Sequence, residues 1–168
     1  YVKDLETSRD AMVLRAIILF SPYRGIISFS DELKAQYEKE YDKWQRSYKQ
    51  AVYELQYRDI NNNDVDNALI EEFKNHMNQD FNVQNVLTLL TSINKEMNTT
   101  LRSKDYDRLA LLTNTFKTIL DVLGINLFVE KMNDEALDIY KKWNAARINK
   151  DFEAADKYRN MLVEWKVL

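Results

Sequence analysis

Cysteine is absent from the sequence, which excludes disulfide bonds and metal sites with thiolate ligands. The only histidine is His76, so neither a zinc site nor a histidine-based catalytic pair is expected. No apolar run reaches the roughly 18 residues that a membrane span needs, and we expect no signal peptide before the first predicted helix. These absences favour a protein of the reducing cytoplasm with no membrane partner.

Glycine and proline are also scarce, with two glycines and one proline among 168 residues. Both residue types interrupt helices and mark turns, so their scarcity favours long helices over a fold of strands and turns. The length fits one domain, or one domain with a small appendage, and allows a sizeable core. We therefore expect an all-α fold: an antiparallel helical bundle with a small C-terminal helical appendage.

The formal net charge is −3, which does not fit a protein that binds nucleic acids nonspecifically through its charge. No DNA partner is expected. The charge is nevertheless uneven, because residues 141–168 contain seven Lys and Arg against four Asp and Glu. Any contact with RNA is therefore expected at the C-terminal end of the chain.

Apolar residues recur at helical spacing through most of the sequence, and capping and turn-forming residues mark the boundaries. Helices are predicted at residues 8–20, 30–57, 64–77, 83–101, 106–123, 134–148 and 152–165. Ser8, Ser30 and Asn82 are predicted N-caps, and Gly124 is predicted to end the fifth helix. The four helices within residues 30–123 have short connections, which is typical of antiparallel neighbours.

The second predicted helix carries a stripe of large apolar side chains at alternating spacings of three and four. Its members are Leu33, Tyr37, Tyr41, Trp44, Tyr48, Val52 and Leu55. Such a stripe can stack bases, but here acidic and basic neighbours alternate and form no basic groove, so we expect core. The first helix is expected to bury Ala11, Leu14, Ile17 and Ile18, and the third Val65, Ala68, Leu69 and Phe73.

Basic, acidic and aromatic side chains alternate where the last two predicted helices meet, on either side of residues 149–151. Asp151 can accept backbone N–H bonds as an N-cap, so the last helix begins at Phe152. Phe152, Asp156 and Arg159 are spaced i, i+4 and i+7, which places them on one helical face. With Arg147 they supply a ring, two guanidinium groups and a carboxylate, which together can stack unpaired bases and bind their edges.

Spacing alone favours a plainer interpretation, a solvated helical hairpin with Phe152 plugging its base. The same residues, however, resemble the C-terminal anticodon-reading segment of bacterial cysteinyl-tRNA synthetases. The matching positions are Ala146, Arg147, Lys150, Asp151, Phe152, Ala155, Asp156, Arg159 and Leu162. Residues 78–82 resemble the family's Asp-Phe-Asn signature, and residues 13–15 and 21–30 resemble the entrance to its anticodon-binding bundle.

The resemblance implies roles for several residues of this segment. Phe152 is expected to stack on the first anticodon base, at a position where the family often has tryptophan. Arg147, Asp156 and Arg159 are expected to contact base edges and phosphates, and Lys150 is a further implied RNA-binding residue. Arg24 is a possible contact with the tRNA stem.

The resemblance also implies a division into three parts. Residues 1–29 end a stem-contact region, residues 30–124 form the helical-bundle anticodon-binding domain, and residues 125–168 form a small anticodon-reading subdomain. The implied partner is the tRNA for cysteine, and the protein is expected to be monomeric.

No catalytic site can be assembled from this sequence, because it has no glycine-rich phosphate loop and no Cys or His pairing for covalent catalysis. By resemblance the parent is a cysteine-tRNA ligase that uses ATP with magnesium, and a zinc ion, in a catalytic domain whose motifs do not occur here. This chain is therefore expected to hold no cofactor or metal and to be inactive alone. The family usually continues past a segment like Val167-Leu168 into a basic tail, so weak isolated binding is expected.

Three alternatives remain open at this point. A related cysteine ligase, the ligase of mycothiol synthesis, shares the architecture but needs no anticodon reader. A helical adaptor would bind protein partners through an apolar groove. A synthetase of different amino-acid specificity with the same bundle would prefer another tRNA.

Overall fold

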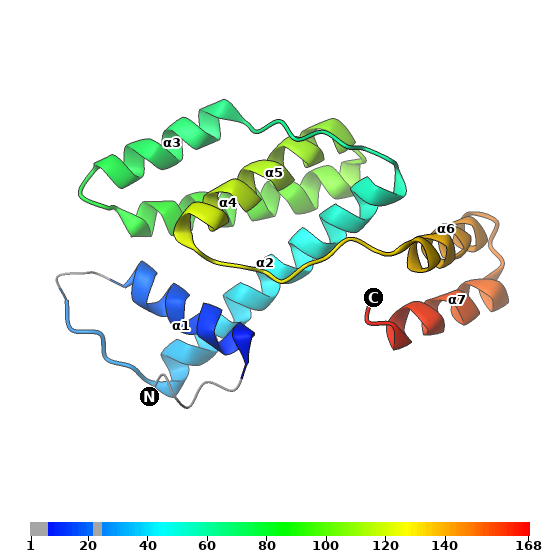
Figure 1. Cartoon of the computed structure of the whole chain (residues 1–168), viewed down its shortest axis with the longest axis horizontal. Coiled ribbons are helices and arrows are strands. Elements are labelled where there is room, and N and C mark those ends of the chain that lie inside the picture. The colour runs from blue at the N-terminus through cyan, green and yellow to red at the C-terminus, as the bar shows by residue number, and fades with distance from the viewer. Residues whose placement is uncertain (1–6, 22–24) are drawn as a thin grey trace. The chain divides into compact units, whose positions relative to one another are not determined.

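The computed structural model describes residues 7–21 and 25–168, and every regular element within these ranges is an α-helix (Figure 1). The helices are α1 Ser8–Phe20, α2 Asp31–Tyr57, α3 Asn67–Asn78, α4 Val83–Ser103, α5 Tyr106–Leu123, α6 Asp134–Ile148 and α7 Phe152–Glu164. The all-α prediction is confirmed. None of the helices in the described ranges is long and apolar enough to cross a membrane.

The chain divides into two compact units. The larger unit contains α1, residues 31–51 of α2, and the stretch Asn62–Val129 with α3, α4 and α5. The smaller unit contains Val52–Asn61, which includes the last turns of α2, and Glu130–Leu168 with α6 and α7. Helix α2 thus contributes side chains to two separate cores.

The core of the larger unit is centred on Trp44 of α2, which is fully buried. Its indole packs edge-to-face against Phe20 of α1, with centroids 6.1 Å apart, and against Phe116 of α5 at 6.3 Å. Tyr37 and Tyr41 are buried on the same stripe, so the interpretation of this stripe as core is confirmed. The Tyr41 hydroxyl donates to the Asn126 carbonyl at 2.7 Å, which holds the segment after α5 against α2.

Two predicted core residues are exposed. Ile18 in α1 has 58% of its surface exposed, and Ala68 in α3 is also exposed. In α1 the buried side chains are Val13, Ala16, Ile17 and Phe20. The residues of α1 near Ile18 are apolar on nearly every side, so periodicity alone did not identify the face that packs against Trp44.

Helix boundaries agree with the prediction to within three residues. Helix α1 is capped by Thr7, one residue before the predicted Ser8, through a capping box with Asp10. Helix α3 begins at Asn67, and not at residue 64, because the Asp66 carboxylate accepts the N–H groups of Ala68 and Leu69. Asp66 therefore occupies the N-cap position.

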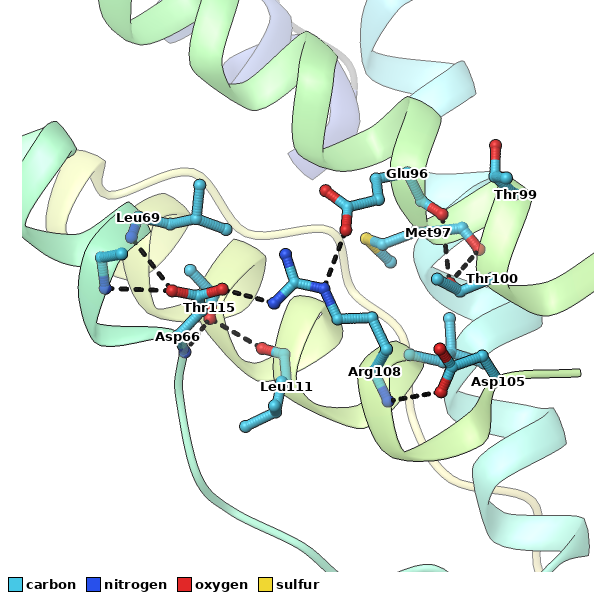
Figure 2. A network of polar contacts seen from close by, with 12 residues as sticks. Asp66, Leu69, Glu96, Met97, Thr99, Thr100, Asp105, Arg108, Leu111 and Thr115 are labelled. Carbon is cyan, nitrogen blue, oxygen red and sulfur yellow. Dashed lines mark hydrogen bonds and ion pairs between the residues drawn. The ribbon is translucent and has the colours of Figure 1, made fainter. Parts of the chain in front are cut away.

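A polar network explains why Asp66 is fixed in that position (Figure 2). The guanidinium of Arg108, in the first turn of α5, forms an ion pair with Asp66 and donates to Glu96 of α4 at 2.8 Å. The Asp66 N–H donates to the Thr115 hydroxyl at 2.8 Å. Arg108 thus joins the start of α3 to α4 and α5, and its hydrogen bond is the main reason why the pKa of Asp66 is lowered.

Most helices in this glycine-poor chain are followed by a residue with a left-handed backbone conformation. Most of these residues are not glycine. Positive φ angles follow the ends of six helices, at Asp59 (56°), Asp80 (54°), Lys104 (62°), Gly124 (68°), Lys150 (58°) and Lys166 (57°). At Gly124 the next N–H, of Ile125, donates to the Leu120 carbonyl at 2.9 Å, the pattern of a Schellman motif. The predicted role of Gly124 in ending α5 is confirmed.

The Asp66–Arg108 ion pair should make folding stability sensitive to acid. Because the pKa of Asp66 is lowered by folding, its stabilisation is complete above its unfolded pKa of about 3.9 and is lost as pH falls through the lower folded value. Asp66→Asn keeps a capping side chain but removes the charge. The free energy of unfolding, measured in urea, should therefore decrease less between pH 6 and pH 2 in Asp66→Asn than in the wild type. Asp64→Asn is the matched control, and an equal change in both variants would contradict the assignment.

Gly124→Ala should destabilise the larger unit. A Cβ at this position meets the guanidinium of Arg15, whose Nε donates to the Leu123 carbonyl at 2.9 Å, and the left-handed backbone disfavours any side chain. We expect a loss of roughly 1–2 kcal/mol in the free energy of unfolding, measured in urea. Lys104 occupies a left-handed position of the same kind, and Lys104→Gly should raise the free energy of unfolding by less than about 1 kcal/mol. A loss in both variants would refute the argument.

Candidate nucleic-acid interface

The corner between α6 and α7 is built from backbone hydrogen bonds. The Asp151 N–H donates to the Ala146 carbonyl at 2.9 Å, and the Lys150 N–H donates to the Arg147 carbonyl at 3.3 Å. Lys150 has the left-handed φ of 58° that this Schellman pattern requires. Asp151 then caps α7, because its carboxylate accepts the Ala154 N–H at 3.1 Å. Each residue between the helices therefore has a defined conformation.

The inner face of α7 is set by the core of the smaller unit. This core consists of Met132, Ala136, Ile139, Tyr140, Leu162 and Val167, with Tyr158 and Met161 partly buried against it. Ala155 is also buried. Ala155, Tyr158 and Leu162 follow each other at spacings of three and four, so they form the inward stripe of the helix.

Three predicted site residues lie on an exposed stripe beside this inward face. Phe152, Asp156 and Arg159 keep the i, i+4, i+7 relation within the continuous helix α7, and all three are exposed. Phe152 has 74% of its surface exposed. We call these residues the outer stripe. Because each residue rises by about 1.5 Å, the stripe is about 10 Å long.

The charged members of the outer stripe are available to a ligand. Within the described part of the chain, the side chains of Asp156 and Arg159 form neither a hydrogen bond nor an ion pair. Their relative positions place a carboxylate and a guanidinium on the same exposed surface as an unburied ring. This combination of groups suits an unpaired nucleotide, which offers a π face, hydrogen-bonding edges and a phosphate.

Arg147 lies at the C-terminal end of α6 and is held by a ring that the sequence analysis did not assign to the site. Its guanidinium carbon is 4.6 Å from the centroid of the Trp143 ring. One guanidinium nitrogen, Nη1, also lies 3.5 Å from the Asn144 amide oxygen. The guanidinium is nevertheless at the exposed end of the helix. The available signal for this pairing was the i, i+4 spacing of Trp143 and Arg147.

The predicted site residues fall into two groups. Arg147, Lys150 and Phe152 lie within six consecutive residues around the corner, and Asp156 and Arg159 lie one and two turns further along α7. Arg24 lies outside the described residues. The exposure of Phe152 contradicts the hairpin interpretation in which this ring plugs the base, since Leu162 and Tyr140 fill the core instead. Ile148, at 76% exposure, is a further apolar side chain at the corner that the sequence analysis missed.

The described residues of the larger unit offer a site of a different kind. An apolar hollow of about 550 Å³ is lined by Ile18, Leu19, Ser21, Met77, Asp80, Phe81 and Val83. The described ranges contain no cluster of three or more His, Cys, Asp or Glu side chains with the geometry to hold a metal ion. Among the sites described, the α6–α7 corner therefore has the side chains best suited to RNA.

Comparison with known proteins gives matches to one family model and to several cysteine-tRNA ligases. Residues 72–128 match the family described as the DALR domain. The cysteine-tRNA ligase of Acholeplasma laidlawii is 32% identical over 163 residues, which cover 97% of this chain and 36% of that protein. The one from Mycoplasma mycoides subsp. mycoides is 30% identical over 169 residues, 99% of this chain and 38% of that protein. The one from a Geobacillus species is 32% identical over 170 residues, 96% of this chain and 36% of that protein. The chain thus spans little more than a third of these relatives.

The exposure of Phe152 leads to a prediction about stability. Phe152→Ala should change the free energy of unfolding of the smaller unit by no more than about 0.5 kcal/mol, since the ring contributes little to the core. Leu162→Ala, which empties a fully buried position on the same helix, should cost roughly 2–5 kcal/mol. Chemical denaturation followed by circular dichroism measures both changes. Similar losses in the two variants would restore the hairpin interpretation.

Proposed function

This chain is a relative of the bacterial cysteine-tRNA ligases, and we propose that it is a tRNA-binding portion whose α6–α7 corner reads the anticodon of the tRNA for cysteine. The observation that carries the proposal is the exposed outer stripe beside a corner that also presents Arg147 and Lys150. A buried Phe152 or ion-paired arginines would leave nothing for RNA to bind. Both conditions for recognition of unpaired bases, an accessible ring and available charges, are present.

Phe152 supplies the stacking surface. An anticodon base that is splayed out of its loop can lie flat on the ring, and such contacts contribute about 1–3 kcal/mol per base. Stacking tolerates any base, so Phe152 gives affinity and not selectivity. A tryptophan at this position would offer a larger ring, and the phenylalanine therefore implies a smaller share of the affinity from stacking.

Selectivity then comes from the charged groups. Arg147 and Arg159 donate to acceptor atoms on base edges or to phosphates, and Asp156 accepts from amino groups on base edges. A carboxylate repels phosphate, so Asp156 disfavours any RNA pose that brings the backbone instead of a base to this position. Lys150 adds a positive charge beside Phe152 and strengthens binding in a salt-dependent manner.

The remaining parts of the chain have supporting roles in this proposal. Residues 30–124, which include most of the DALR match, are assigned in this proposal to a helical anticodon-binding domain, although the stretch Val52–Asn61 belongs to the smaller compact unit. Residues 1–29 lead into it from a region that contacts the tRNA stem, with Arg24 as a candidate contact, and residues 125–168 read the anticodon. The ligase reaction, with its ATP, magnesium and zinc, belongs to parts of the whole enzyme outside this sequence. The whole enzyme acts in the cytoplasm as a monomer.

Anticodon reading can be tested with two transcripts, the tRNA for cysteine and the same tRNA with a changed anticodon. Filter binding at constant salt should show tighter binding of the first, because only that anticodon satisfies Arg147, Asp156 and Arg159. Arg147→Ala should reduce the preference by roughly 5- to 100-fold, the range for one good bidentate contact. Phe152→Ala should weaken binding of both transcripts, whereas Phe152→Tyr should not.

Arg102→Ala is the matched control for loss of a cation, since Arg102 is exposed on α4 in the larger unit. It should leave the preference unchanged. Equal binding of both transcripts by the wild type would exclude anticodon reading. A uniform effect of Arg147→Ala and Arg102→Ala would reduce the role of the corner to general electrostatics.

A further inference from the structure

A continuous series of ring contacts ends at Arg147. Tyr57, at the end of α2, packs edge-to-face against Tyr140 of α6 with centroids 5.7 Å apart. Tyr140 packs in the same manner against Trp143 at 5.5 Å, and the Arg147 guanidinium lies over the Trp143 ring at 4.6 Å. All four residues belong to the smaller unit. Arg147 is thus connected through rings to a buried part of that unit.

The rings at the inner end of this series are fixed in place. Tyr140 is buried and belongs to the core of the smaller unit, and Trp143 is packed against that core with part of its surface exposed. Burial raises the pKa of Tyr140 to about 12, so its hydroxyl stays neutral at physiological pH. The orientation of the indole is therefore constrained by packing. It does not depend on the charge state of its neighbour.

Stacking leaves the hydrogen-bonding capacity of Arg147 intact. The contact with Trp143 is a cation–π contact with the guanidinium carbon 4.6 Å from the ring centroid, and a contact of this kind is not a hydrogen bond to any of the five N–H donors. The long approach to Asn144, at 3.5 Å, involves only one of its nitrogens. The remaining donors are oriented before any ligand arrives. An ordered side chain loses less entropy on binding than a mobile one and adapts less easily to a wrong base.

We propose that Trp143 is a positioning residue, which holds Arg147 stacked in its binding orientation and thereby sets how strongly the corner discriminates between anticodons. This inference rests on the proposed anticodon reading and adds a residue to it. Trp143 itself need not touch RNA. The distinguishing feature is that its effect passes through Arg147, whereas a purely structural tryptophan affects the whole unit.

The test compares Trp143→Phe, which keeps a ring, with Trp143→Leu, which keeps apolar bulk but loses the π face. Each variant is made alone and together with Arg147→Ala. The two transcripts described above give the ratio of dissociation constants, and thermal unfolding gives the stability. Trp143→Leu should lower the ratio about 5-fold or more, and Trp143→Phe less than 3-fold. In the Arg147→Ala background, Trp143→Leu should change the ratio less than 2-fold.

A second measurement does not need RNA. The side-chain protons of Arg147 should show an upfield ring-current shift in NMR spectra of the wild type and Trp143→Phe, and this shift should disappear in Trp143→Leu. Its absence from the wild type would overturn the proposal, as would a loss of discrimination by Trp143→Leu that is just as large without Arg147. If the shift is present but the wild type binds both transcripts equally, anticodon reading fails while the stacking of Arg147 stands.

Discussion

The structure depends on satisfying backbone groups at the ends of its helices. Side-chain oxygens accept first-turn N–H groups at Thr7, Asp66, Asn82, Asp105, Asn133 and Asp151. At the opposite ends, left-handed residues fold the chain back onto the last carbonyls. The α6–α7 corner combines both devices in consecutive residues, Lys150 and Asp151. Its side chains therefore project from a defined backbone, although no tertiary core surrounds them.

Local rules were sufficient for most of the fold. Helix α5 and the start of α7 follow the predicted boundaries, because Gly124 and Asp151 act through their immediate neighbours. The predicted start of α3 was wrong. Asp66 is fixed by Arg108 of α5, which lies 42 residues later in the chain. The exposure of Ile18 was also missed, because its helix is apolar on several sides and only contacts with Trp44 select one of them. These two errors arose where distant residues decide local geometry.

The candidate site shows the same division. The common face of Phe152, Asp156 and Arg159 follows from helical periodicity once Asp151 starts α7, and the structure keeps these residues exposed. The contact of Arg147 with Trp143 was not predicted. This contact depends on the packing of Trp143 against Tyr140 and of Tyr140 against Tyr57. Tyr57 lies 83 residues before Tyr140 and belongs to the same unit because the end of α2 is part of that unit. Helical spacing in the sequence could show which residues share a face of a helix. It could not show which neighbouring side chain orients a given residue.

The contribution of α2 to the smaller unit constrains how the corner can be separated from the rest of the chain. Tyr53 and Tyr57 pack against the core that also holds Met132, Tyr140 and Leu162. The Gln56 side chain donates to the Met132 carbonyl at 2.7 Å and accepts the Met132 N–H at 2.8 Å, so the entrance to α6 is fixed by α2 as well. Residues 130–168 alone would lose these rings and both hydrogen bonds. The platform beneath Arg147 is therefore built by two distant segments, and Tyr57 is connected to the corner through Tyr140 and Trp143 although it belongs to none of the proposed RNA-binding positions.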